Sequence, residues 1–81
     1  MRKDIQIVGI GSRRTGTTKK GDPFDFIPVS ITFEDARYSG HRAETVNMDG
    51  GDFDRCRPVV GEVYDAVMHE QNFKVYLDAI L

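Results

Sequence analysis

The 81-residue sequence holds one cysteine, three prolines and no tryptophan. Because Cys56 has no partner, an intrachain disulfide is excluded, and no cysteine or histidine cluster has metal-site spacing. No apolar run approaches the roughly 20 residues of a membrane-spanning helix, and the opening MRKDIQIVGI is too short and too soon charged for a signal peptide. We therefore expect one cytoplasmic domain, residues 1–81, without a metal, a cofactor or a membrane contact.

The sequence also lacks the motifs of common catalytic sites. His41 and His69 have no serine, cysteine or carboxylate partner evident in the sequence. The glycines of GIGSRRTG match neither a phosphate-binding loop nor a dinucleotide-binding motif, and the acidic loop MDGGDFD lacks the spacing of a calcium-binding loop. We predict no catalytic residues, no enzyme activity and no small-molecule substrate.

Positive charge is concentrated near the start of the chain. Residues 1–20 hold six lysines or arginines and one aspartate, a local charge of +5, so the other residues must carry −7 to give the net charge of −2. Four of these cations surround a turn in SRRTGTTKKGDPFDF, residues 12–26. Such asymmetry indicates either a charged partner for one face or a solvated hairpin tip, and charge alone leaves both interpretations open.

Period-two alternation predicts strands along much of the chain. DIQIVGI, residues 4–10, is expected to form a strand with a bulge near Gly9, and FDFIPVSITFED, residues 24–35, a second strand. Pro28 cannot donate to a ladder, which predicts a sheet edge at the start of this second strand. RAETVNM, residues 42–48, is a weaker third strand. The second strand places four apolar side chains on one face: Ile27, Val29, Ile31 and Phe33.

The last third of the chain fits two patterns. Residues 60–68 place apolar side chains at helical spacing, whereas residues 73–81 alternate at period two. Residues 49–58, DGGDFDRCRP, are expected to be irregular because their glycines and proline disfavour a long helix. We favour two strands, roughly 61–69 and 72–81, joined by a turn in HEQN, with the helical pattern left open. Five short strands predict an all-β fold, a small antiparallel barrel that is closed or partly open.

Two aromatic side chains directly follow the basic turn. Phe24 and Phe26 fall on the strand face opposite the apolar row, so they point away from the core if that row fills it. Unpaired nucleic acid binds to such a combination, because cations contact phosphates and every base can stack on a ring. The alternative is that the two rings pack together and close the base of the hairpin, and the residue pattern favours neither interpretation.

The run GTTKKGDPFDF, residues 16–26, resembles the DNA-binding wing of the filamentous-phage single-stranded DNA-binding proteins, the helix-destabilising or gene V-type family. The similarity is ungapped at the two glycines, the proline, the lysine position and the aromatic position. It continues through IPVSITFED, residues 27–35, a strand that closes with an acidic pair. Elsewhere only the length and the strand pattern agree in outline.

This resemblance implies an OB-like five-stranded antiparallel barrel with a protruding basic hairpin wing. It also implies a symmetric homodimer that coats replicating single-stranded DNA cooperatively and without sequence choice, in the cytoplasm of a bacterial host if the protein is phage-encoded. We expect RNA as a secondary ligand of the same surface. The family pattern assigns DNA contacts to Arg14, Lys19, Lys20, Phe24 and Phe26, and charge alone adds Arg13.

Two points separate this chain from the family pattern. The third strand, RAETVNM, has none of the expected aromatics, for which Tyr38 and Phe53 are the candidate substitutes. The net negative charge is also unhelpful for a DNA coat, so binding should depend heavily on the wing. The alternative function is a small β-barrel protein-interaction module that docks a protein partner through an exposed phenylalanine patch.

Overall fold

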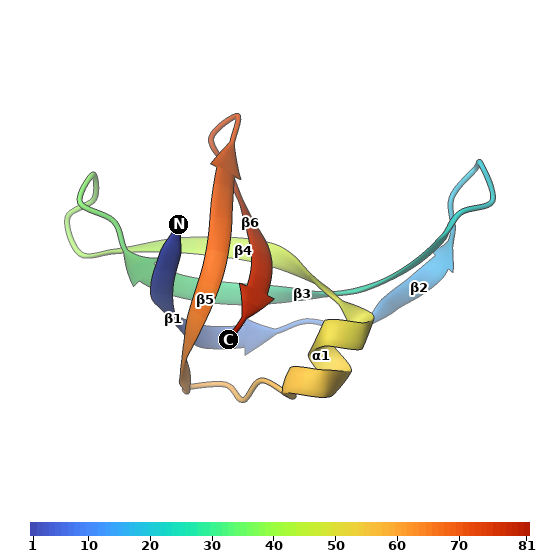
Figure 1. Cartoon of the computed structure of the whole chain (residues 1–81), viewed down its shortest axis with the longest axis horizontal. Helices are drawn as coiled ribbons and strands as arrows, with labels where there is room; N and C mark the ends of the chain where they lie inside the picture. The colour runs from blue at the N-terminus through green and yellow to red at the C-terminus, as the bar shows by residue number, and fades with distance from the viewer.

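The computed structural model describes all 81 residues and confirms an all-β fold of antiparallel strands with one short helix (Figure 1). The predicted core strands are all present. The elements in chain order are β1 (Arg2–Ile10), β2 (Arg14–Thr17), β3 (Pro23–Glu34), β4 (His41–Asp49), α1 (Gly50–Cys56), β5 (Val63–Gln71) and β6 (Lys74–Ile80).

Strand β3 is the centre of the sheet. The hydrogen-bonded order is β2-β3-β1-β5-β6, and β4 pairs with β3 along residues 26–34. No ladder joins β4 to β6, so the sheet is curved but not closed. Apart from the short β2, this arrangement agrees with the expected small OB-like barrel, a fold that is commonly only partly closed.

Alternation along β3 divides its side chains as the sequence predicts. Ile27 is 2 % exposed and belongs to a core of eleven buried apolar residues, whereas Phe24 and Phe26 are half-buried and lie outside that core. The core draws on five strands and consists of Ile5, Ile7, Ile27, Val29, Ile31, Phe33, Val46, Met48, Ala66, Met68 and Val75. The two phenylalanines therefore add less than Ile27 to the burial that stabilises the domain.

Two irregularities in the pairing of β1 and β3 follow from the sequence. The register shifts between Ile7 and Gly9, which confirms the predicted bulge and makes Val8 the extra residue. The start of β3 is a sheet edge, as expected, because residues 23–25 pair with β2 alone, and Pro28 pairs with β4 alone. This proline falls in the gap where β3 has left β2 at Phe26 and joins β1 only at Val29. A missing N–H therefore breaks no ladder on that side.

The two C-terminal strands are confirmed, and their turn lies later in the chain than expected. Strand β5 runs through most of HEQN, and the chain reverses at Asn72 and Phe73. Both residues have positive φ, 53° and 64°, as the tight two-residue turns that match strand twist require. The expectation of a turn centred on HEQN is therefore wrong by two residues.

The segment predicted to be irregular contains α1. The Asp49 carboxylate accepts hydrogen bonds from the backbone N–H groups of Gly51 and Asp52, which caps the first turn. The helix ends at Arg57, whose φ of 46° stops it. The first aspartate of the acidic loop, Asp49, is thus a helix cap. No helix of the structure has the length and apolar character needed to cross a membrane.

One hairpin extends well away from the rest of the molecule. The overall dimensions are 42 × 28 × 19 Å, and β2 with the first third of β3 reaches out along the longest axis (Figure 1). The β5–β6 hairpin projects separately, and the β3–β4 loop lies at the opposite end from β2. The protruding hairpin, residues 13–26, is called the wing below.

Candidate nucleic-acid interface

The wing is a two-stranded ribbon closed by a polar turn. Its ladder pairs β2 with the start of β3, from Arg14 opposite Phe26 to Thr17 opposite Pro23. At the tip, the N–H of Thr18 donates to the carbonyl of Asp22 over 2.8 Å. Gly21, at φ 86°, takes the left-handed conformation that favours glycine. This turn places Lys19 and Lys20 at the exposed end of the ribbon.

The two phenylalanines share one face of the wing with an arginine. Directly opposed residues in an antiparallel ladder point to the same face, so Arg14 accompanies Phe26 and Gly16 accompanies Phe24. A Cβ on Gly16 would lie 2.8 Å from Cζ of Phe24, so this ring lies across the glycine. The two ring centroids are 5.8 Å apart with an interplanar angle of 37°. The face therefore presents two neighbouring aromatic rings beside a cation.

An open hollow of about 690 Å³ lies along this part of the wing. It is wide and open to solvent rather than enclosed. The hollow is lined by Arg13, Arg14, Thr15, Thr18, Phe24 and Phe26. Four of the six predicted site residues thus border one depression, with the other two at the tip beyond it.

Three of the four wing cations are free of carboxylates. Arg14, Lys19 and Lys20 are exposed and take part in none of the ion pairs of the structure. Unpaired cations on a protruding ribbon lose no internal contact when they meet a phosphate. They remain available for an anionic ligand.

The fourth cation, Arg13, is engaged inside the protein. Its guanidinium lies 2.6 Å from a carboxylate oxygen of Asp25 in β3 and 2.8 Å from one of Asp54 in α1. These hydrogen bonds raise the pKa of Arg13, the bonds to Asp25 more than those to Asp54. Arg13 in turn lowers the pKa of Asp25. Its ion pairs therefore distinguish Arg13 from the other three wing cations, although it borders the same hollow as Arg14.

Sequence reasoning missed an aromatic at the tip of the β5–β6 hairpin. Phe73 is 93 % exposed, and its φ of 64° is unusual for a bulky side chain. A residue kept in a strained conformation with its ring in solvent suggests a role outside the fold. In OB folds, the loop between the last two strands is one of the regions that bind oligonucleotides. Locating Phe73 at the tip required the exact turn position, which the alternation alone did not provide.

Other polar and aromatic side chains continue from this tip along the hairpin. The ring of Tyr76 stacks on His69 with centroids 4.9 Å apart and an interplanar angle of 12°. The Lys74 Nζ lies 5.3 Å from the Tyr76 centroid. His69 Nδ1 is 2.7 Å from a carboxylate oxygen of Asp78. The hairpin thus offers a second group of rings and a lysine, apart from the wing.

The two candidate substitutes for third-strand aromatics lie elsewhere. Phe53 is in α1 and is half-buried against the hydrophobic core. Tyr38 lies in the β3–β4 loop, with the Arg42 guanidinium carbon 5.4 Å from its ring centroid. That loop is at the far end of the molecule from the wing (Figure 1). Neither residue extends the wing surface.

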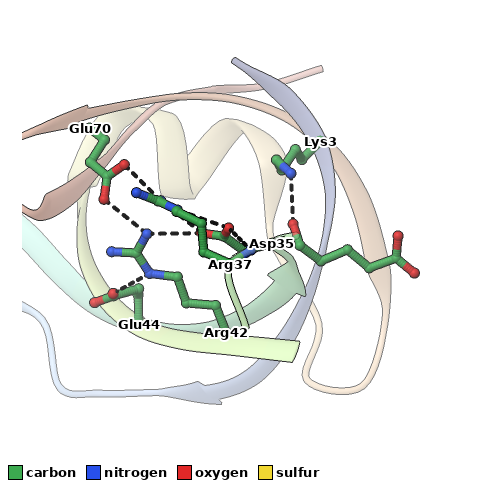
Figure 2. Close-up of polar contacts among 7 residues, drawn as sticks. Lys3, Asp35, Arg37, Arg42, Glu44 and Glu70 are labelled. Carbon is green, nitrogen blue, oxygen red and sulfur yellow. Dashed lines mark hydrogen bonds and ion pairs between the residues drawn. The ribbon is translucent and has the colours of Figure 1, made fainter. Parts of the chain in front are cut away.

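The other large charged cluster ties the β3–β4 loop to β5 (Figure 2). Arg42 is 4 % exposed and bonds to Glu44, Glu70 and Asp35 at 2.7, 2.9 and 3.2 Å. Arg37 also bridges Asp35 and Glu70. Hydrogen bonds from both arginines lower the pKa of Asp35, with Arg37 the larger cause. They also lower the pKa of Glu70, with Arg42 the larger cause. The cluster satisfies a buried guanidinium and is structural.

The geometry thus assembles Arg14, Phe24 and Phe26 on one face of the wing, with Lys19 and Lys20 at its tip. Neither cluster outside the wing joins this surface directly. Comparisons of the chain with protein-family models, with curated proteins and with solved structures found no match.

Proposed function

We propose that this protein binds single-stranded DNA without sequence preference, and RNA as a secondary ligand, through the wing. The observation that carries the proposal is the coincidence, on one protruding ribbon, of two neighbouring rings and three unpaired cations. Cations that follow the backbone beside rings that stack on bases are what single-strand binding needs. The similarity of residues 16–26 to the wing of the gene V-type phage proteins supports the same function.

The chemistry of the wing also explains why such binding would ignore sequence. Every base has a face that can stack on Phe24 or Phe26, and the cations contact phosphates that all nucleotides share. The body of the protein carries net negative charge, so attraction is confined to the wing. The wing holds no histidine, serine or cysteine, and its Asp25 carboxylate is paired with Arg13, which favours binding without catalysis.

We further propose that the protein acts as a symmetric homodimer and coats replicating single strands in the cytoplasm of a bacterial host. Exposed valines support self-association. Val59 and Val60 are in the loop before β5, and backbone hydrogen bonds from this loop to Ile7 bring it beside the exposed Val8 and Val63. Several large apolar side chains gathered on adjoining segments are typical of a surface that another chain covers.

The test is a fluorescence anisotropy titration at low salt. The probe is labelled oligo-dT longer than the roughly 4–16 nucleotides that one OB fold covers, and the competitors are duplex DNA and single-stranded oligo-U. We expect oligo-dT to bind, oligo-U to compete and duplex DNA to compete poorly, since its bases are already stacked. Sedimentation in the same buffer should show a dimer at micromolar concentration. No binding at low salt, with intact folding, would instead favour the protein-interaction module.

A further inference from the structure

We infer that Arg13 is a positioning residue, which fixes the wing against α1, and that it makes no phosphate contact. The binding part of this inference rests on the proposed function; the orientation part stands on the geometry alone. Arg13 begins the wing, Asp25 lies in the wing strand of β3, and Asp54 lies on α1. The three side chains, called the clamp below, join the ribbon to the body.

The guanidinium of Arg13 is almost fully occupied by the two carboxylates. Nε and Nη2 donate to the two oxygens of Asp25 over 2.8 and 2.6 Å. Nη1 and Nη2 donate to the two oxygens of Asp54 over 2.8 and 3.1 Å. A guanidinium has five N–H donors, so these four hydrogen bonds leave no two free N–H groups that could bind a phosphate in bidentate fashion. Arg13 would have to abandon an existing partner to bind one.

Asp25 of the clamp lies on the wing face opposite the aromatic rings, although the Arg13 side chain also borders the hollow that the rings line. Thr15 is the cross-strand neighbour of Asp25, whereas Arg14 is that of Phe26, so alternation puts Asp25 and the rings on opposite sides. A nucleic-acid strand stacked on Phe24 and Phe26 would therefore approach Arg14 first. The face of the wing that carries Asp25 lies toward α1 instead.

Without the clamp, few contacts would set the angle of the wing. Strand β2 pairs with β3 and with no other strand, so the ribbon is attached mainly through β3. The Asp25 carboxylate lies so close to Gly50, the first residue of α1, that a Cβ there would collide with it. Asp25 is thus fitted between Arg13 and the start of the helix. Exposed ion pairs add little to stability, but a bidentate guanidinium imposes a direction.

The two roles of Arg13 predict opposite signs for loss of Asp54. If Arg13 contacted phosphate, Asp54→Ala would free it, remove a negative charge and tighten oligo-dT binding. If Arg13 positions the wing, the same change lets the ribbon swing and weakens binding. Should about one-tenth of the molecules keep the competent orientation, the affinity falls about tenfold. The matched control is Asp52→Ala. This change also removes one negative charge from α1, but the lost carboxylate is the partner of Arg55 and not of Arg13.

Lysine substitutions separate the roles a second time. Arg13→Lys keeps the charge but cannot bridge two carboxylates with a planar fork, so it should weaken oligo-dT binding about as much as Arg13→Gln. Arg14→Lys should retain most of the affinity. The slope of log Kobs against log salt should stay unchanged in Arg13→Gln, whereas Arg14→Gln should lose about 0.7, the share of one phosphate contact.

A spin-label distance measurement tests the clamp without nucleic acid. Labels on Thr17→Cys and Ala43→Cys, in a Cys56→Ser background, report the separation of the wing from β4. We expect a narrow distance distribution that broadens with Asp54→Ala or Arg13→Gln and stays narrow with Asp52→Ala. Unchanged distributions, or tighter oligo-dT binding by Asp54→Ala, would overturn the inference. If the parent protein fails to bind oligo-dT at all, the proposed function fails while these distances still decide the clamp.

Discussion

Phe26 and Ile27 are adjacent in β3, yet the structure gives them opposite surroundings. Ile27 is 2 % exposed in the core, whereas Phe26 lies on the outer face of the wing, beside Phe24. Substituting each in turn therefore separates folding from binding within a single peptide unit. We expect each substitution to affect one property strongly and the other weakly.

The change Ile27→Ala should act on stability. Removing a buried isoleucine side chain costs about 2–5 kcal/mol, because transfer energy is lost and a cavity remains. A domain of this length has a total stability of only about 4–12 kcal/mol. Ile27→Val, expected to cost about 0.5–1.5 kcal/mol, keeps the test readable if the alanine variant fails to fold. Affinity for oligo-dT should change only through the fraction folded.

The change Phe26→Ala should act on binding. A base stacked on an aromatic ring is worth about 1–3 kcal/mol, so the dissociation constant should rise about 5- to 150-fold. The free energy of unfolding should fall far less than for Ile27→Ala, since the main loss is one aromatic pair worth about 0.5–1.5 kcal/mol. Phe26→Leu keeps the apolar contact and should restore stability without restoring affinity.

Urea denaturation and oligo-dT anisotropy on the same preparations measure both quantities. Loss of folding by Phe26→Ala, together with normal folding and binding by Ile27→Ala, would invert the assignment of faces. Wild-type folding and binding by both Phe24→Ala and Phe26→Ala would mean that the rings form neither core nor site. Either result would refute the stacking argument.

Salt, acid and the C-terminal hairpin tip offer three further tests. Three unpaired wing cations at about −0.7 each predict a log–log salt slope of about −2 per protomer, and salt-independent affinity would contradict this. The lowered pKa values of Asp35 and Glu70 predict stability that is complete above about pH 5 and falls as acid protonates them; Glu70→Gln should flatten that fall in urea titrations at pH 7 and pH 3. Phe73→Gly should stabilise the tight turn, since glycine accepts positive φ, yet weaken oligo-dT binding by about 1–3 kcal/mol. Unchanged anisotropy for that variant would place the tip outside the interface.

The faces of β3 were predictable because alternation is a local property. Four apolar residues two apart identify the buried side of a strand wherever its partners lie, and Phe24 and Phe26 follow on the other side. The same reasoning found the bulge beside Gly9, where the alternation changes phase. The protruding wing was expected from the resemblance to the gene V-type family, whereas the residues alone indicated only a polar, basic turn.

Features that depend on distant partners or on a single cap were not predictable. Helix α1 has seven residues, two of them glycine, and depends on the Asp49 cap rather than on apolar periodicity. The role of Arg13 depends on Asp54, 41 residues away in sequence. Charge counting therefore grouped Arg13 with Arg14, although the ladder and the helix place their side chains in different surroundings.

An amide chemical-shift titration of the labelled protein with oligo-dT at low salt tests the central claim most directly. If the wing binds single strands, the largest shift changes should fall on residues 14–26, with a smaller set at the β5–β6 tip. Amides of the β3–β4 loop, at the far end of the molecule, should keep their chemical shifts. Absence of shifts in the wing at saturating oligo-dT, or shifts confined to the β3–β4 loop, would contradict the account.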